Sequence, residues 1–218
     1  MILSPSLRKL TLATHVTASV GWVGALTVFL AHAIASVASQ DALIVRSACI
    51  AMGVTAWFVI FPLSIASLLT GIIQALGSAW GLIRHDWVLA KLLLTVLATV
   101  VLLLKLPPIG GLADAAMQGA FSRDDLIGLR VSVLVHAIGG LLVLLTATTL
   151  AIYKPAGLTP FGVRRLRERS GAGGGADLPA VAIVPLWVRV FAAAGFLLLM
   201  MVGIMMLAGS HGPGAHLS

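Results

Sequence analysis

The chain has 218 residues, of which 60% are apolar and only 10% are charged, and it carries 14 Lys and Arg against 7 Asp and Glu. A soluble domain usually contains about 25% charged residues, so the composition excludes a soluble globular protein. The net charge of +7 does not indicate nucleic-acid binding, because the basic residues lie between apolar runs, as in membrane loops, and not on one soluble face.

Five apolar runs follow one another along the chain, separated by polar or charged segments. About 20 apolar residues cross a bilayer as a helix, which satisfies its own backbone hydrogen bonds there. The sequence therefore predicts an all-α, polytopic transmembrane helical bundle. Its expected spans are Leu10–Ala38, the centre of Ser47–Ile83, Trp87–Leu106, Val131–Tyr153 and Pro185–Leu207.

The first two spans carry local start and bend signals. Ser4 and Pro5 are the expected N-cap and first residue of the first helix. The apolar core of a signal peptide is usually about 7–15 residues long, so we expect the much longer first run to be retained as a span. Pro62 should kink the second span because it lacks an N–H, and Ser64 or a neighbouring helix can satisfy the freed carbonyl.

A charged hairpin is expected between the second and third spans. Trp80 and Trp87 flank it, and indole rings favour the membrane–water boundary. Asp86 is the predicted N-cap of the third helix, where its carboxylate would accept free backbone N–H groups. Lys91 lies one turn inside that helix, and we expect its amine to extend to the lipid headgroups.

The third span is expected to end at Lys105 and Leu106, because Pro107 and Pro108 follow directly. The segment Ile109–Arg130 is then predicted as a loop that contains a short surface helix, Leu112–Phe121.

The chain divides into three expected regions. Residues 1–153 form a four-span membrane bundle, residues 154–185 form a basic cytoplasmic loop and linker, and residues 186–218 form the fifth span with a short outer tail. Each Lys or Arg near an anionic membrane surface contributes about 1 kcal/mol of binding. Lipid is therefore the main expected partner, and a homo-oligomer is also compatible with the sequence. The residues expected to bind anionic headgroups are Arg164, Arg165, Arg167 and Arg169.

The distribution of Lys and Arg predicts the orientation of the spans, because these residues favour the cytoplasmic side. With the N-terminus inside, the outer set is limited to Arg46, Lys105, Arg123 and Arg130, and all other Lys and Arg are inside. The sequence therefore predicts an N-in, C-out arrangement.

Histidines within the spans are the candidate functional residues, because ionisable groups in a membrane usually have a role. Neutral imidazole binds haem iron and copper, so His15, His32 and His136 are candidate cofactor ligands, with His15 and His136 also candidate metal ligands. His32 and His136 are expected at a similar depth near the outer side, whereas His15 lies roughly 13 Å deeper at a rise of about 1.5 Å per residue. The alternative is that all three only pack and form hydrogen bonds.

Several short stretches together resemble a known family. They are His15 with Trp22-Val23-Gly24, Leu69-Thr70-Gly71, Trp80-Gly81-Leu82, Trp87-Val88-Leu89 with Lys91, and Tyr153-Lys154-Pro155 with Gly157-Leu158-Thr159-Pro160.

These stretches are similar to predicted bacterial integral membrane proteins of unknown function, of an actinobacterial type. That family in turn looks distantly similar to CopD-type copper-resistance membrane proteins, which share a His followed by Trp-x-Gly in a span. The resemblance implies a small helical bundle in the bacterial plasma (inner) membrane and carries no established activity with it. The Met-rich periplasmic features of a copper importer are not evident in this sequence.

Two functions therefore remain open from the sequence. The first is a b-type haem or copper protein for electron transfer or metal handling, held by the span histidines. The second is a cofactor-free membrane accessory subunit or small-solute permease. Motifs of hydrolases, zinc proteases and phosphate-binding loops are absent, so the sequence does not decide whether the protein is an enzyme.

Overall fold

The structure, a computed structural model, describes residues 4–77, 85–118 and 126–153, and all of the elements within these residues are helices. Four of its helical segments are long and apolar enough to cross a membrane, so the first four expected spans are confirmed as helices. The fifth expected span and the basic loop lie outside the described residues. The elements are α1 (Pro5–Ala38), α2 (Ala42–Thr55), the π-helical turn η1 (Ala56–Ile60), α3 (Phe61–Gly77), α4 (Asp86–Met117) and α5 (Ile127–Tyr153).

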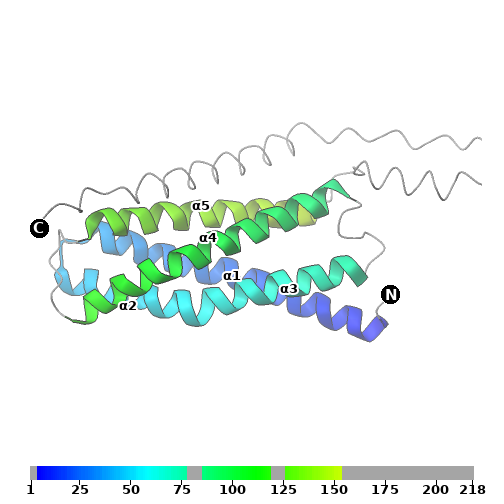
Figure 1. Ribbon diagram of the computed structural model, residues 1–218, viewed down its shortest axis with the longest axis horizontal. Helices are drawn as coiled ribbons and strands as arrows, with labels where there is room; N and C mark the ends of the chain where they lie inside the picture. The colour runs from blue at the N-terminus through cyan, green and yellow to red at the C-terminus, as the bar shows by residue number, and fades with distance from the viewer. Residues whose placement is uncertain (1–3, 78–84, 119–125, 154–218) are drawn as a thin grey trace, which may run out of the picture.

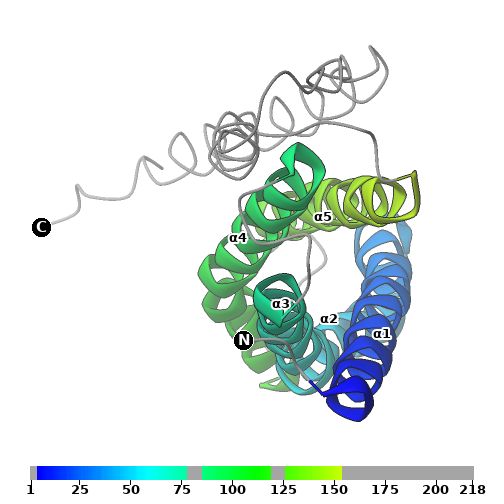
Figure 2. The ribbon, with the colours of Figure 1, turned by 90° about the vertical axis from the view of Figure 1, so that its right-hand side faces the viewer.

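The helices form an up-and-down bundle. One end of the bundle holds the start of α1, the end of α3, the start of α4 and the end of α5 (Figure 1). The opposite end holds the end of α1, the start of α2, the end of α4 and the start of α5. α1 packs against α2, α3 and α5, while α4 packs against α2, α3 and α5 from the other side. Viewed along its length, the bundle is a ring in which α1 and α4 face each other (Figure 2). Long side chains of α1 and α4 can still meet in the interior, as His15 and Lys91 do.

The start of α1 is as the sequence predicts. Ser4 is the N-cap, and its hydroxyl accepts a hydrogen bond of 3.4 Å from the Leu7 N–H, while Pro5 is the first helical residue. Proline suits this position because its missing N–H would have no partner inside the helix.

Pro62 does not break the second span, because a π-helical turn precedes it. Residues Ala56–Ile60 form this turn, and the N–H of Phe61 bonds to the carbonyl of Ala56. The Ser64 hydroxyl donates to the Phe61 carbonyl at 2.7 Å. The helix thus adds a wider turn where proline removes a donor, and α2, η1 and α3 form one continuous span.

The expected end of the third span is wrong. α4 continues through Pro107 and Pro108 to Met117, where a loop with a separate surface helix was predicted. Beyond the prolines, Ile109, Leu112 and Ala116 are buried in the core. Burial of these side chains stabilises the helical continuation, and membrane helices tolerate proline where neighbours satisfy the backbone.

The extension of α4 depends on close contact with α2. A Cβ built on Gly53 of α2 would lie only 2.6 Å from the Cβ of Ala113 in α4. Only glycine lets the two backbones approach this closely, which is how small residues commonly join membrane helices.

Asp86 is not the N-cap of α4, contrary to expectation. His85 has the extended backbone of the N-cap, and Asp86 is the first helical residue. Its carboxylate still lies at the positive end of the helix dipole, where an anion is favourable.

Two arginines bind helix C-termini at the opposite end of the bundle. Arg130, fully buried in the first turn of α5, donates to the carbonyl of Ser36 near the end of α1. Arg46 of α2 donates from Nε to the carbonyl of Ala116 near the end of α4, at 3.0 Å. Terminal carbonyls lack partners within their own helix, so each arginine satisfies one of them and fixes two helices together.

Candidate functional site

His15 is the centre of a buried polar cluster between α1, α3 and α4. Its side chain is only 7% exposed. Its Nδ1 lies 3.0 Å from the Ser67 carbonyl oxygen and 3.2 Å from the Thr70 hydroxyl, both on α3. Its Nε2 lies 3.0 Å from Nζ of Lys91 on α4.

These contacts determine which His15 nitrogen carries the proton. A carbonyl oxygen only accepts hydrogen bonds, so Nδ1 carries the hydrogen and donates it to Ser67. Nε2 is then the acceptor, and the Lys91 amine donates to it. A hydrogen-bonded chain thus runs from Lys91 through His15 to the backbone of α3.

The walls of this cluster are shaped to hold the imidazole. The Thr70 hydroxyl donates to the Ala66 carbonyl at 2.6 Å, which leaves its oxygen free to accept from His15. Ser19 and Ser67 share a hydrogen bond of 2.7 Å between their hydroxyls. A Cβ on Gly71 would lie 3.0 Å from Cε1 of His15, so the ring rests directly against the α3 backbone.

Lys91 therefore differs from its expected role. The sequence suggested that its amine reaches the lipid headgroups, whereas the structure turns it inward to His15. Lys91 as a whole is half-buried, but its amine lies in the interior of the bundle, against His15.

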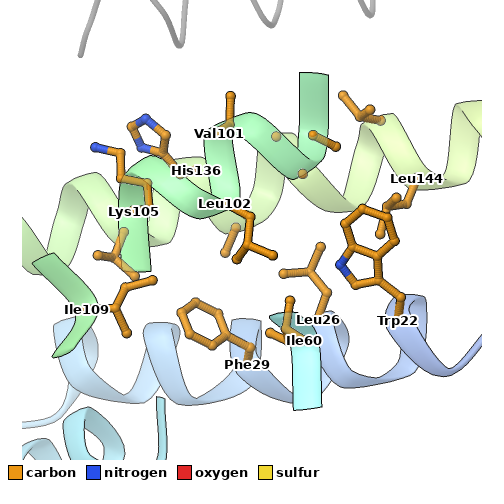
Figure 3. Close-up of a pocket in the computed structure, with 16 residues that line it drawn as sticks. Trp22, Leu26, Phe29, Ile60, Val101, Leu102, Lys105, Ile109, His136 and Leu144 are labelled. Carbon is orange, nitrogen blue, oxygen red and sulfur yellow. The ribbon is translucent and has the colours of Figure 1, made fainter. Parts of the chain in front are cut away.

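A second polar pair lies in the opposite half of the bundle, on α4 and α5. His136 is 8% exposed, and its Nδ1 lies 2.6 Å from the Ser132 carbonyl one turn earlier. Its Nε2 is buried and has no hydrogen-bond partner among the described residues. Nζ of Lys105 lies 3.4 Å from the Ser132 hydroxyl, and Figure 3 shows this amine beside the His136 ring.

Lys105 is much deeper in the bundle than the sequence suggested. It was expected to mark the end of a span, but α4 continues about 18 Å beyond it at a rise of about 1.5 Å per residue. The position is therefore inside the bundle.

His136 and Lys105 lie at one end of a pocket of about 70 Å³ that is lined by residues of α1, η1, α4 and α5. The His136 ring and the Lys105 amine point away from the α1 side of this pocket (Figure 3). Trp22 and Leu144 lie toward its other end, with Leu26 and Phe29 along the α1 wall (Figure 3). Apart from the two nitrogen-bearing side chains and the indole N–H of Trp22, the lining side chains are apolar.

The three candidate histidines lie in three different places. His15 contacts Lys91, and His136 lies beside Lys105. These lysines are about 21 Å apart along α4 at a rise of about 1.5 Å per residue. His32 is half-buried and is not part of the pocket wall. Its Nδ1 is buried and has no hydrogen-bond partner in the part of the chain that the structure describes. The structure therefore does not bring His15 and His136 together, and no cluster of three or more metal-binding residues occurs among the described residues.

Sequence reasoning selected the histidines but missed the two lysines as their partners. A signal was present, because Lys91 and Lys105 both lie within or at the edge of apolar runs where a charge is costly. Thr95 and Thr99 lie between them on α4 and are buried, which marks one helix face as polar.

No protein-family model matches the sequence, and comparison with curated proteins and with solved structures finds no significantly similar protein.

Proposed function

We propose that this chain is a multi-pass membrane protein that lets a small monovalent anion, or its conjugate acid, cross the bilayer through a positively charged interior. The observation that carries the proposal is the pairing of Lys91 with His15. A lysine in a bundle interior usually has an acidic partner, but here its partner is a ring nitrogen.

The charge balance of the interior supports an anionic solute. The acidic residues of the described part are Asp41, Asp86 and Asp114, and each lies at or near a helix end. Lys91 and Lys105 therefore face no carboxylate in the interior of the described bundle. An entering anion would supply the missing counter-charge and offset part of the cost of burying the ammonium groups.

The two lysines also suggest a route. They are about 21 Å apart along α4, which is most of the roughly 30 Å thickness of the hydrocarbon core. Thr95 and Thr99 lie between them, and each hydroxyl donates to a carbonyl one turn earlier, at 2.8 and 2.9 Å. Such hydroxyls keep an oxygen lone pair for a proton or water that accompanies the anion.

We propose the N-in orientation with five spans, so that Lys91 lies toward the cytoplasm and Lys105 toward the outside. The bacterial plasma membrane is proposed from the motif resemblance alone. The same resemblance supports membership of that bacterial family.

A haem or copper centre is the second candidate, and one observation favours it. His136 donates through Nδ1 to a carbonyl, as metal-bound histidines commonly do, and its buried Nε2 has no partner among the described residues. The ammonium of Lys105 beside it would repel a cation, however, and the Nε2 of His15 already accepts from Lys91. An absorption spectrum of the purified protein separates the two candidates, because a Soret band would favour haem.

The proposal is tested by anion entry into proteoliposomes containing the full chain. Stopped-flow light scattering in potassium salts of chloride, nitrate and acetate, with valinomycin present, reports anion entry above that of empty liposomes. We expect Lys91→Met and Lys105→Met each to reduce entry at least about tenfold, because each removes an interior positive charge and a hydrogen bond to a charged group. Lys9→Met, which removes an exposed charge near the start of α1, is the matched control and should keep wild-type rates.

Two results would overturn the proposal. One is wild-type protein that admits none of the three anions faster than empty liposomes do. The other is an equal rate in the wild type and both interior lysine variants.

A further inference from the structure

We propose that the groove between α2 and α4 binds a membrane phospholipid with a primary ammonium headgroup, such as phosphatidylethanolamine. The groove has a volume of about 420 Å³, within the range of about 300–1,000 Å³ that ligand pockets usually have. Neither Lys91 nor Lys105 lines it, so this inference does not depend on the proposed function. It is carried by the apolar walls of the groove and by the charges of Asp114 and Arg46 at one end of it.

The walls of the groove are two apolar stripes, one on each helix, with residues spaced three or four apart. The stripe on α2 and η1 leads to Trp57 and Phe58, and the stripe on α4 includes Pro107, Gly110 and Gly111. Phe58 is 76% exposed and Trp57 is 45% exposed, so the groove opens toward the surrounding lipid. Because the two glycines have no side chains, an acyl chain can lie directly against the α4 backbone. Van der Waals packing of this kind drives association within a membrane.

Charged groups of both signs lie at one end of the groove, where α4 ends beside α2 (Figure 1). Asp114 lines the groove one turn before the end of α4, and its carboxylate has no hydrogen bond or ion pair among the described residues. Arg46 lies one turn before Ile50 of the α2 stripe, and its Nε donates to the Ala116 carbonyl at 3.0 Å. Its two terminal nitrogens have no partner within the described part of the chain.

These two charges match a zwitterionic headgroup. Ala116 is two residues from Asp114, so Arg46 and Asp114 lie at a similar level of α4. The guanidinium of Arg46 can bind the phosphate through its terminal nitrogens, because its planar shape suits phosphate oxygens. The carboxylate of Asp114 can accept charge-assisted hydrogen bonds from the ammonium.

The indole N–H of Trp57 supplies a third polar contact, deeper in the groove. A Cβ on Gly110 would lie 3.5 Å from Nε1 of Trp57, so this edge of the ring lies over the glycine. Phe61 packs edge-on against the indole, with ring centroids 6.2 Å apart. Gly110 and Asp114 are about 6 Å apart along α4 at a rise of about 1.5 Å per residue. A phospholipid separates its ester carbonyls from its ammonium on this scale, so one lipid can accept from Trp57 and donate to Asp114.

The charges also discriminate between headgroups. Phosphatidylglycerol carries a phosphate for Arg46 but has no cation for Asp114, whose carboxylate repels it. Phosphatidylcholine has both charges, but its trimethylated nitrogen has no hydrogen to donate. A primary ammonium headgroup satisfies both side chains.

Native mass spectrometry of the purified full-length protein in detergent, titrated with one dioleoyl phospholipid at a time, tests the polar end. We expect phosphatidylethanolamine to bind at least about fivefold more tightly than phosphatidylglycerol or phosphatidylcholine, because only its ammonium donates to a charged partner. Asp114→Asn should weaken phosphatidylethanolamine binding at least about fivefold and leave phosphatidylglycerol binding unchanged or stronger.

Asp41→Asn is the matched control for Asp114→Asn. Asp41 is the exposed N-cap of α2 at the same end of the bundle, and asparagine caps a helix about as well as aspartate. This variant should bind each lipid as the wild type does. The site would be overturned by equal phosphatidylethanolamine binding in the two variants, or by wild-type protein that does not distinguish the three lipids.

A groove-filling variant tests the apolar part without altering a charge. Gly111 lines the groove, and a Cβ there would meet nothing within 4 Å, so Gly111→Leu places a side chain in the groove. We expect it to weaken phosphatidylethanolamine binding several-fold. Gly24→Leu on the exposed side of α1, where a Cβ would also meet nothing within 4 Å, should bind as the wild type does. Equal binding by these two variants would contradict the assignment.

The same spectra separate a lipid from a second copy of this chain as the occupant of the groove. The expected species carries one tightly bound phosphatidylethanolamine per chain. A lipid-free dimer that Gly111→Leu converts to a monomer would assign the groove to a second copy and overturn the lipid proposal. Neither test measures anion entry, so a failure here would leave the proposed function standing.

Discussion

At the scale of single residues, the contact between α1, α3 and α4 is centred on the His15 imidazole, which packs against Gly71. His15 uses both ring nitrogens, with Nδ1 bonded to α3 and Nε2 bonded to Lys91. The ring therefore cannot rotate without losing two hydrogen bonds inside the bundle. Leaving such a group unsatisfied costs about 1–3 kcal/mol, so the position of His15 also fixes the positions of its neighbours.

Gly71→Ala tests whether the His15 ring is held in place by its hydrogen bonds. The new Cβ would lie 3.0 Å from Cε1 of His15, and the hydrogen-bonded ring cannot move away from it. We expect a loss of about 1–3 kcal/mol of stability, as for other substitutions that overpack a core, seen as a lower thermal unfolding temperature in detergent.

Gly24→Ala provides the matched control for Gly71→Ala, because it adds the same methyl group into open space on α1. Alanine favours helix over glycine, so this variant should be as stable as the wild type or more so. Equal unfolding temperatures for the two variants would show that the His15 ring is not held as described.

At the scale of elements, the number and positions of the described helices could be predicted from the sequence, but not all of their ends. Apolar runs predict membrane helices because lipid leaves the backbone no other hydrogen-bond partners. Pro107 and Pro108 predicted a break, which is what they cause in water. The packing of Gly53 against Ala113 instead keeps α4 helical to Met117, and that contact joins helices distant in sequence.

A double-mutant cycle across this contact tests the extension of α4. Gly53→Ala would place its Cβ 2.6 Å from the Cβ of Ala113, and we expect it to lower stability by about 1–3 kcal/mol. Ala113→Gly in the same protein should restore most of the loss, since the clashing methyl is gone. If residues 109–117 formed the loop expected from the sequence, Gly53→Ala would have little effect and the second change would rescue nothing.

In the candidate site, too, some features could be predicted from the sequence and others could not. His15 and His136 could be selected because each is an ionisable residue within an apolar run. Their pairing with Lys91 and Lys105 could not, because it depends on which faces of α1, α4 and α5 meet. A local pattern predicts that a helix forms, but not its rotation about its own axis.

At the scale of the whole molecule, the two ends of the bundle differ. One end is tied together by Arg130 and Arg46, which bind carbonyls at the ends of α1 and α4. The polar cluster of His15 lies toward the opposite end, in the half of the bundle where α1 and α4 begin. Any opening that admits a solute would therefore require less rearrangement at the His15 end than at the arginine end.

The orientation of the whole molecule is open to a direct test. With the N-terminus inside and five spans, an alkaline phosphatase fused at Ser218 should be active, and one fused near Gly174 should be inactive, because the enzyme folds only outside the cytoplasm. The expectation follows from the excess of Lys and Arg on the inner side. The reverse pattern of activity would invert the proposed positions of Lys91 and Lys105.

The π-helical turn η1 has a consequence for the angular phase of the second span. It holds one residue more than an α-helical turn would, and each residue advances a helix by about 100°. α3 is therefore rotated by that angle relative to an uninterrupted continuation of α2. Ser67 and Thr70 face His15 only because of this offset. A regular α-helix with the same number of residues would turn Ser67 and Thr70 away from His15 by that angle. Deleting one residue from Ala56–Ile60 should therefore leave a regular α-helical turn and keep the polar face of α3 toward the interior.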